Sequence, residues 1–298
     1  MAIKVVITDA FSSLGQAILS EFETTHCSVL TPAKDELDWS NSGAVTDYFQ
    51  AHQVHVVVNT LGYAEFQTKQ QQVLLQKAAE SIAAACANTA AIPIHMSSYR
   101  VFGGENKSSY DEQDNPSPIS ASGRAYRQAE KVFENSLEKF ICLRLAWLID
   151  TQEDTLFRRI LNGIVELEDY SVTDQRTGAP IGLESVAKVV ISTVQQVMCG
   201  AQNWGVYQYA SGDVCTEAEL AEVLEQIVWE KCEIKSTWHV DVLSNEALIA
   251  PGVSEPVSSV LSVRRCRDDF GVQPTSWRQG LSKHVVLWAE QHALTVDP

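Results

Sequence analysis

The sequence predicts an α/β fold: a Rossmann-like, doubly wound parallel sheet with a smaller, interwoven α+β lobe on the substrate side. In the first half of the 298 residues, short runs rich in Val and Ile alternate with longer segments of helical periodicity. These runs are apolar at consecutive positions, which is typical of parallel strands buried on both faces. Because parallel strands are joined by right-handed crossovers, the alternation indicates one open sheet with helices on both faces.

The first half contains the strands and helices that this fold needs, in alternating order. The expected strands are Ile3–Thr8, Cys27–Leu30, His55–Thr60, Ile92–Ser98 and Phe140–Ile149. The expected helices are Leu14–Thr24, Ala44–His52, Thr68–Asn88 and Ala121–Leu137. Ser40 and Asn41 precede the second helix, and both residue types are favoured N-caps.

The second half has a more mixed pattern. Helices are expected at Glu153–Leu167, Leu183–Met198, Thr216–Glu230 and Trp277–His292, with one short strand at Gly205–Ala210. We therefore predict a dinucleotide-binding-type domain over residues 1–150, to which residues 171–200 return. Residues 151–298 are expected to form mainly the smaller substrate-binding-type lobe.

Composition restricts the class of partner. The chain has 22 basic and 38 acidic residues, a formal charge of −16, which disfavours nucleic acid and anionic lipid as partners. Its apolar runs are shorter than the roughly 18 residues of a membrane span, and seven scattered cysteines without a CxxC pair suggest reduced thiols. We expect a cytoplasmic protein with a small-molecule ligand. His52 and His55 have ligand-like spacing but no accompanying Cys or carboxylate cluster, so no metal site is expected.

The exit of the first strand is where a nucleotide-binding βαβ unit needs glycines, because the pyrophosphate approaches bare backbone at the helix N-terminus. Only Gly15 occupies a glycine position of the GxxGxxG pattern, and Asp9 and Ser12 stand at the other two. Asp9 adds negative charge where the pyrophosphate would lie, so binding of NAD(P) is possible but doubtful. In the alternative interpretation, Ser12 or Ser13 caps the helix and Gly15 allows close helix–strand packing.

Several segments resemble the motifs of one enzyme family. IHMSSYRVFGG (94–104) and LRLAWLI (143–149) are similar to its fourth-strand and fifth-strand segments. VTDQRTGAPIG (172–182) is close to its Asp-Gln-x-Gly-x-Pro-Thr signature, with one extra residue before the glycine. The matching residues there are Asp174, Gln175, Gly178 and Pro180. Over nearly its whole length the chain resembles the dTDP-4-dehydrorhamnose reductases, which are extended short-chain dehydrogenase/reductases.

The resemblance implies where ligands would lie. Cofactor contacts are implied at Thr8, Phe11, Ser12, Ser13, Leu14, Gly15, Asn59 and Leu61, and substrate contacts at Arg100, Trp147, Gln175 and Pro180. Lys34 and Asp35 follow the second strand and leave the choice between NAD and NADP open. Arg124 and Gln128, one helical turn apart, are a further candidate pair for a phosphate, although a solvated helix face is the simpler interpretation.

The family's chemistry uses a tyrosine as proton donor, a lysine four residues later, and a Ser or Thr at the end of the fourth strand. The tyrosine and lysine act together because positions i and i+4 share a helix face. An ungapped alignment of Glu130 and Arg144 with the family places Ser122 at the tyrosine position and Tyr126 at the lysine position. Ser98 keeps the Ser/Thr position. Lys131 follows Tyr126 by five residues, and no Tyr-x-x-x-Lys occurs in the chain.

Three functions stay open from the sequence. The first is a catalytically impaired relative that binds a nucleotide or sugar nucleotide, or serves as a regulatory or scaffold subunit. The second is an active NAD(P)H-dependent reductase of a 4-keto sugar nucleotide with a rearranged site, in which Tyr99 or Tyr126 acts with Ser98. The third is a homodimer or partner-binding protein with an unused cleft.

Overall fold

The computed structural model describes residues 2–64, 68–105, 107–166, 171–232, 241–244, 255–292 and 294. Its centre is a six-stranded sheet in the order β10-β5-β4-β3-β1-β2, in which every neighbouring pair is parallel. The strands are β1 (Lys4–Ile7), β2 (Ser28–Leu30), β3 (Val56–Asn59), β4 (Ile92–Ser98), β5 (Ile141–Leu145) and β10 (Gly205–Tyr209). The predicted α/β, Rossmann-like fold class is confirmed.

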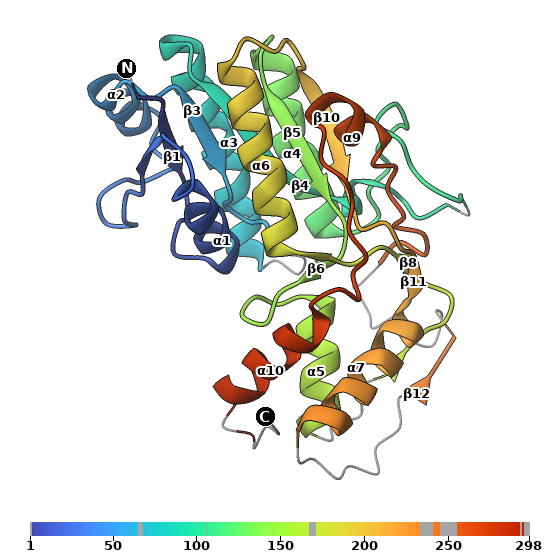
Figure 1. Cartoon of the computed structure of the whole chain (residues 1–298). Coiled ribbons are helices and arrows are strands. Elements are labelled where there is room, and N and C mark those ends of the chain that lie inside the picture. The colour runs from blue at the N-terminus through green and yellow to red at the C-terminus, as the bar shows by residue number, and fades with distance from the viewer. Residues whose placement is uncertain are drawn as a thin grey trace.

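Helices cover both faces of this sheet (Figure 1). On one face pack α2 (Ser42–His52), α3 (Lys69–Thr89) and α4 (Ala121–Ser136), and on the other α1 (Ser13–Phe22), α6 (Leu183–Met198) and α9 (Arg264–Phe270). Each face of the sheet has its own hydrophobic core. Successive residues of a strand point to opposite faces, so Val6 belongs to the core on one face and Val5 and Ile7 to the core on the other. This explains why the strand runs are apolar without alternation.

The helix N-termini follow the expected capping chemistry. Asn41 caps α2, accepting a hydrogen bond from the Ala44 amide at 3.1 Å. Thr68 caps α3 through a reciprocal capping box with Gln71. Ser120 caps α4 by accepting from the Gly123 amide at 3.0 Å. A Cβ atom on Gly123 would lie 2.1 Å from the Arg100 carbonyl oxygen, so this glycine sets how closely α4 approaches the end of β4.

The outer edge of β10 is protected by side-chain hydrogen bonds. Arg265 on α9 donates to the Val206 and Trp204 carbonyls at 2.7 and 2.9 Å. Its guanidinium also lies 4.2 Å from the centre of the Tyr207 ring. Because an open edge strand is a template for pairing with another chain, this cover favours a sheet that ends at β10.

The second half supplies elements to both parts of the molecule. Helix α6 and strand β10 join the main sheet, whereas α5 (Leu156–Glu166), α7 (Glu217–Lys231) and α10 (Leu281–Gln291) gather beyond its carboxyl ends (Figure 1). Three short strand pairs lie outside the main sheet: β6 (Leu148–Ile149) with β9 (Ile181–Gly182), β8 (Thr177–Gly178) with β11 (Cys215–Thr216), and β7 (Ser171–Val172) with β12 (Asp241–Val242). A domain boundary at residue 150 stays a prediction.

Two predicted elements differ from the structure. The run Phe140–Ile149 is divided, because the chain leaves the main sheet after Leu145 and β6 pairs with β9 instead. Both halves are buried, so hydrophobicity does not mark the break. The helix expected from Trp277 begins at Leu281, since Gly280 has φ +80°, outside the helical region. Leu167, the last residue of another predicted helix, lies outside the described residues.

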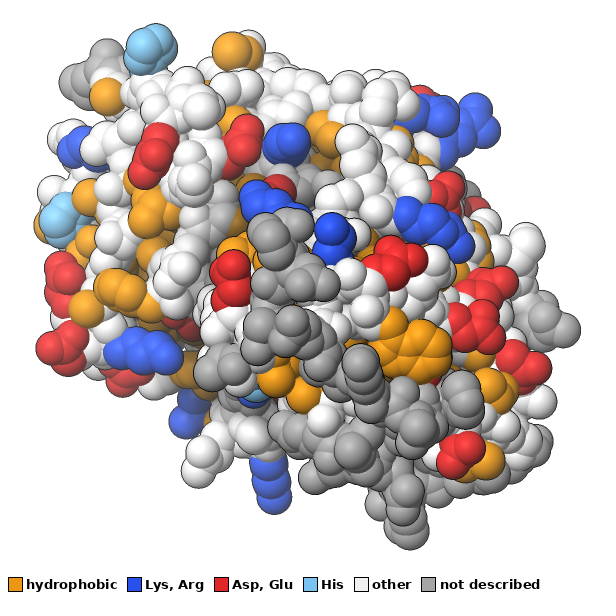
Figure 2. All heavy atoms as spheres, turned by 60° about the horizontal axis from the view of Figure 1, so that its bottom comes forward, with side chains coloured by type: hydrophobic (Ala, Val, Ile, Leu, Met, Phe, Trp, Pro, Cys, Tyr) orange, Lys and Arg blue, Asp and Glu red, His pale blue; other side chains and the backbone are white. Residues whose placement is uncertain are grey.

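Surface charge is mixed where it can be inspected. On the face shown in Figure 2, Asp and Glu side chains lie among Lys and Arg side chains, so local donors exist despite the net negative charge. Within the described part of the chain, no helix combines the length and apolar character that crossing a membrane requires.

Candidate functional site

The turn after β1 is closed by its own side chains. Ser12 is the N-cap of α1: its Oγ accepts from the Gly15 amide at 3.2 Å and donates to the Asp9 carbonyl at 2.8 Å. A Cβ atom on Gly15 would lie 2.0 Å from that same carbonyl oxygen. Ser12 therefore caps the helix and Gly15 permits close packing, as the alternative interpretation expected. The neighbouring Phe11 side chain is 61% exposed.

Polar groups also bridge the ends of β1 and β3. Thr8 Oγ1 donates to Asn59 Oδ1 at 3.2 Å and accepts from the Thr60 amide at 3.0 Å. Asn59 Oδ1 accepts a further bond from the Leu61 amide at 3.2 Å. Strand order reverses between β1 and β3, so this is the topological switch point, where open α/β sheets bind ligands. The structure thus gathers the residues predicted to contact a cofactor, but Thr8, Asn59 and Leu61 already bond to one another.

A cluster that sequence reasoning missed lies beside them. The carboxylate of Asp150, directly after β6, accepts from Ser13 Oγ at 2.5 Å and from the Tyr63 hydroxyl at 2.9 Å. The two hydroxyl oxygens are 2.7 Å apart, and the Tyr63 hydroxyl accepts from the Leu14 amide at 3.3 Å. We call Ser13, Tyr63 and Asp150 the switch-point cluster. The sequence signal for this cluster was a carboxylate directly after a buried strand. Nothing in the sequence indicated which residues would bind it.

Electrostatics around this cluster are dominated by carboxylates. Burial, reinforced by the Asp150 charge, raises the pKa of Tyr63, so its hydroxyl stays protonated. Burial, with Asp150 and Asp9 adding to it, also raises the pKa of Glu153. The carboxylates of Asp9 and Asp150 therefore both act on Glu153 beside the switch point.

Helix α4 carries Ser122 and Tyr126, the residues that the sequence alignment assigned to the family's catalytic positions. Tyr126 is fully buried, and its hydroxyl lies 2.6 Å from the Gly62 carbonyl oxygen and 2.7 Å from that of Ala64. Its single proton is thus directed at the β3–α3 loop. Ser122 is half-buried and accepts from Gln72 Nε2 at 3.5 Å, whereas Lys131 is exposed. Ser98 Oγ accepts from the Arg100 amide at 3.3 Å and caps the 3₁₀ turn η1 (Tyr99–Val101).

Arg100 and Arg144 are held in ion pairs. Arg100 pairs with Glu255 at 2.8 Å, and Arg144 donates to both carboxylate oxygens of Glu130 at 2.8 and 2.9 Å. Glu130 also accepts from Ser97 at 2.6 Å and from Arg127 at 2.9 Å. Burial opposes ionisation of Glu130, but the bonds and charge of Arg144 outweigh it and lower the pKa of this carboxyl. Arg124 is exposed and donates to the Ile119 carbonyl at 3.1 Å.

Trp147, Gln175 and Pro180, which were predicted to contact the substrate, lie in different surroundings. Trp147 is buried, and a Cβ atom on Gly178 would lie 2.3 Å from its indole ring, so the signature glycine makes room for this tryptophan. Gln175 lies exposed on the loop between β7 and β8, where its amide donates to Thr173 Oγ1 at 3.2 Å. Pro180 lines a pocket, described next. Their roles in binding stay predictions.

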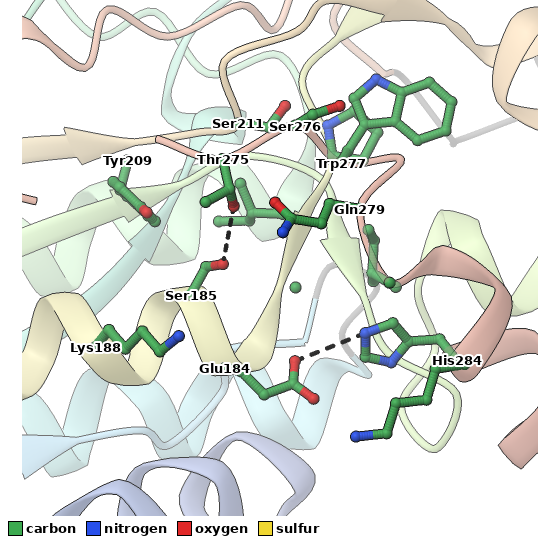
Figure 3. A pocket seen from close by; sticks show the side chains of 16 residues that line it. Glu184, Ser185, Lys188, Tyr209, Ser211, Thr275, Ser276, Trp277, Gln279 and His284 are labelled. Atoms are coloured by element: carbon green, nitrogen blue, oxygen red, sulfur yellow. Dashed lines mark hydrogen bonds and ion pairs between the residues drawn. The ribbon is translucent and has the colours of Figure 1, made fainter. Parts of the chain in front are cut away.

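A pocket of about 290 Å³ opens between the N-termini of α6 and α10 (Figure 3). Glu184, Ser185 and Lys188 of α6 face the segment before α10 and His284 on that helix. The Glu184 carboxylate lies 3.7 Å from His284 Nε2, and the hydroxyl oxygens of Ser185 and Thr275 lie 3.5 Å apart. A second pocket of about 370 Å³ shares Ile149, Glu184 and His284 with it and reaches Ser13 and Asp150. The two pockets therefore meet beside the switch-point cluster.

The sequence of the chain matches one protein family. The family model described as RmlD substrate binding domain matches residues 3–289. A dTDP-4-dehydrorhamnose reductase of Aggregatibacter actinomycetemcomitans is 22% identical over 300 residues, covering 96% of this chain and 99% of that protein.

Solved structures of the same named enzyme share the fold. The crystal structure of a dTDP-4-dehydrorhamnose reductase from Clostridium acetobutylicum has a TM-score of 0.82 at 23% identity, covering 96% of this chain and 99% of that one. The Bacillus anthracis dTDP-4-dehydrorhamnose reductase in complex with NADP has a TM-score of 0.79 at 20% identity, with the same coverage.

Proposed function

The chain belongs to the RmlD substrate binding domain family, and on that premise we propose that it binds a nucleotide or sugar nucleotide while its reductase chemistry is impaired. The proposal includes a regulatory or scaffold role, in which the partner is a second copy of the chain or another protein. The ligand class is supported by the similar proteins, which are named for a dTDP-linked sugar substrate.

One observation carries the proposed impairment. Tyr126 occupies the position where the family has its lysine, and its hydroxyl proton is directed at the carbonyls of Gly62 and Ala64. A catalytic acid must have its proton within hydrogen-bond reach of the substrate oxygen. Ser122, at the tyrosine position, has a far less acidic hydroxyl than a phenol, and Lys131 on the same helix is exposed. Loss of positioned acid catalysis costs roughly 10²–10⁴ in rate.

The rearranged-site alternative has weaker support. Its other proposed donor, Tyr99, is buried, and its hydroxyl lies 3.4 Å from the Glu255 carboxylate that also binds Arg100. A phenol that donates to a carboxylate is a poor acid for a substrate, because its proton is already engaged. Ser98 Oγ accepts a hydrogen bond from the backbone amide of Arg100, so this oxygen already has a partner within the chain.

The test combines a binding measurement with a turnover measurement on the intact protein. Thermal unfolding is followed with dTDP and dTDP-glucose, and we expect both to raise the melting temperature, since a ligand that binds only the folded state stabilises it. NADPH oxidation with a dTDP-4-keto-6-deoxy sugar is expected to stay at the background rate. Robust turnover would contradict the proposed impairment, and its loss in Tyr99→Phe or Tyr126→Phe would identify a rearranged donor. Absence of any shift with either nucleotide would contradict the proposed binding.

A further inference from the structure

Helix α1 begins at the carboxyl end of β1, which is where a Rossmann-like sheet binds the pyrophosphate of a dinucleotide. Two amides of its first turn are already bonded to side chains of the protein. The Leu14 amide donates to the Tyr63 hydroxyl at 3.3 Å, and the Gly15 amide donates to Ser12 Oγ at 3.2 Å. A pyrophosphate would have to displace these acceptors, so these two donors do not fit the family's cofactor as they stand.

A carboxylate of the protein itself, that of Asp150, lies next to these donors. Asp150 is 3% exposed and its Oδ2 accepts from Ser13 in the first turn and from Tyr63 after β3. Its other oxygen, Oδ1, accepts from the Gln152 amide at 2.9 Å, which holds the carboxylate in place. The anionic group that a helix N-terminus favours is therefore supplied internally.

The position of the cluster gives it a specific consequence. Ser13 follows β1 and Tyr63 follows β3, the two strands between which the sheet order reverses. Asp150 enters from β6 and connects the two exits. Asp9, which shares the electrostatic environment of this carboxylate through Glu153, adds a further negative charge. A phosphate here would meet like charges in a partly buried site, where screening by water is weak.

We propose that Asp150 is the residue that determines nucleotide specificity at the switch point: through Ser13 and Tyr63 it closes the N-terminus of α1 and excludes the pyrophosphate of a dinucleotide. This inference deepens the proposed function, since it concerns the same cleft and rests on it for the ligand class. It also separates two ligands that the family binds together. The sugar nucleotide binds, whereas NAD(P)H does not.

The experiment uses the full chain and measures binding directly. NADPH is titrated into wild type and Asp150→Asn and followed by its fluorescence, with inorganic pyrophosphate titrated by calorimetry. The substitution keeps the volume and removes the charge, and we expect NADPH and pyrophosphate to bind about ten- to a hundredfold more tightly than to wild type. Asp154→Asn is the matched control: it removes the same charge four residues away, from a side chain that is 49% exposed and pairs with Arg159, and should leave NADPH binding unchanged.

A second variant keeps the proposal testable if Asp150→Asn does not fold. Tyr63→Phe retains the ring and frees the Leu14 amide, and we expect it also to bind pyrophosphate more tightly than wild type. Tight NADPH binding to wild type, or equal affinities for wild type and the folded variants, would overturn the proposal. The dTDP-glucose titration, run on every variant, tests the proposed function separately. If dTDP-glucose does not bind but Asp150→Asn binds NADPH more tightly than wild type, sugar-nucleotide binding is rejected and the proposed role of Asp150 is retained.

Discussion

The guanidinium of Arg144 on β5 donates two hydrogen bonds, of 2.8 and 2.9 Å, to the carboxylate of Glu130 on α4, and both side chains are almost fully buried. This pair fixes how α4 lies over the sheet, and with it the positions of Ser122 and Tyr126 on the same helix. The alignment that places those two residues at the family's catalytic positions used the same Glu130 and Arg144.

Replacement of Glu130 by Gln should destabilise the protein strongly. The Arg144 charge would stay buried without its counter-ion, and breaking a buried pair in this way typically costs about 3–5 kcal/mol. Urea unfolding measures the free energy of unfolding. Glu134→Gln is the matched control, because Glu134 is 28% exposed and pairs with the half-buried Arg127, so its loss should cost less than about 1 kcal/mol. Equal losses in the two variants would argue against a structural role for the Arg144–Glu130 pair.

Tyr126→Phe should reduce stability and leave NADPH oxidation at the background rate of the wild type. The change removes the hydroxyl that donates to the Gly62 and Ala64 carbonyls, which should cost about 1–2 kcal/mol because buried acceptors lose a donor. Tyr48→Phe on α2, where the ring is half-buried, serves as the control for removing a tyrosine hydroxyl. If Tyr126 were a catalytic acid, the wild type would instead turn over the keto sugar nucleotide, and the substitution would lower that turnover by roughly 10²–10⁴ with little change in stability.

Gly15→Ala should be poorly tolerated. The new Cβ atom would lie 2.0 Å from the Asp9 carbonyl oxygen, so backbone at the β1–α1 turn must shift. Overpacking of this kind costs about 1–3 kcal/mol or more. Gly43 in the first turn of α2 provides the contrast, since the nearest atom to its Cβ would be the Asn41 side chain at 3.5 Å. Gly43→Ala should stabilise the protein by about 0.4–1 kcal/mol, and chemical denaturation distinguishes the two signs.

His95 should make stability fall as the pH is lowered. Its Nδ1 accepts from the Asn59 side-chain amide at 3.0 Å, so the folded state holds the neutral ring. Burial lowers the pKa of His95 to about 4, against a smaller opposing effect of Glu130. Between about pH 6.5 and 4 the unfolded chain therefore binds a proton that the folded chain does not, and stability must rise with pH in that window.

The size of this effect is measured against a variant without the titrating ring. Relative to His95→Gln, the wild type should lose about 2 kcal/mol of unfolding free energy between pH 6.5 and 5, at about 1.4 kcal/mol per pH unit. Urea unfolding at the two pH values provides both numbers. Parallel pH profiles for wild type and variant would show that the ring titrates at its ordinary pKa.

Local patterns were enough to predict the class of fold and the positions of its main elements. Buried apolar runs predicted all five strands of the first half, and capping residues such as Asn41 marked helix starts. The end of β5 was missed because Leu145 and Leu148 are equally buried, one against the main sheet and one beside β9. Burial depends on what lies opposite, and a run of hydrophobic letters does not contain that information.

The sequence by itself determined the α/β architecture, and it supplied the hypotheses that Asp9 and Ser12 stand at glycine positions and that Ser122 and Tyr126 stand at the positions of the Tyr-x-x-x-Lys pair. These are properties of single positions and of local spacing. Only the tertiary structure decided that Tyr126 donates to the loop after β3, and that Asp150 meets Ser13 and Tyr63. The partners of Asp150 lie 137 and 87 residues away. Strand order places the carboxyl ends of β1 and β3 side by side, and the β6–β9 pair outside the main sheet brings Asp150 to them.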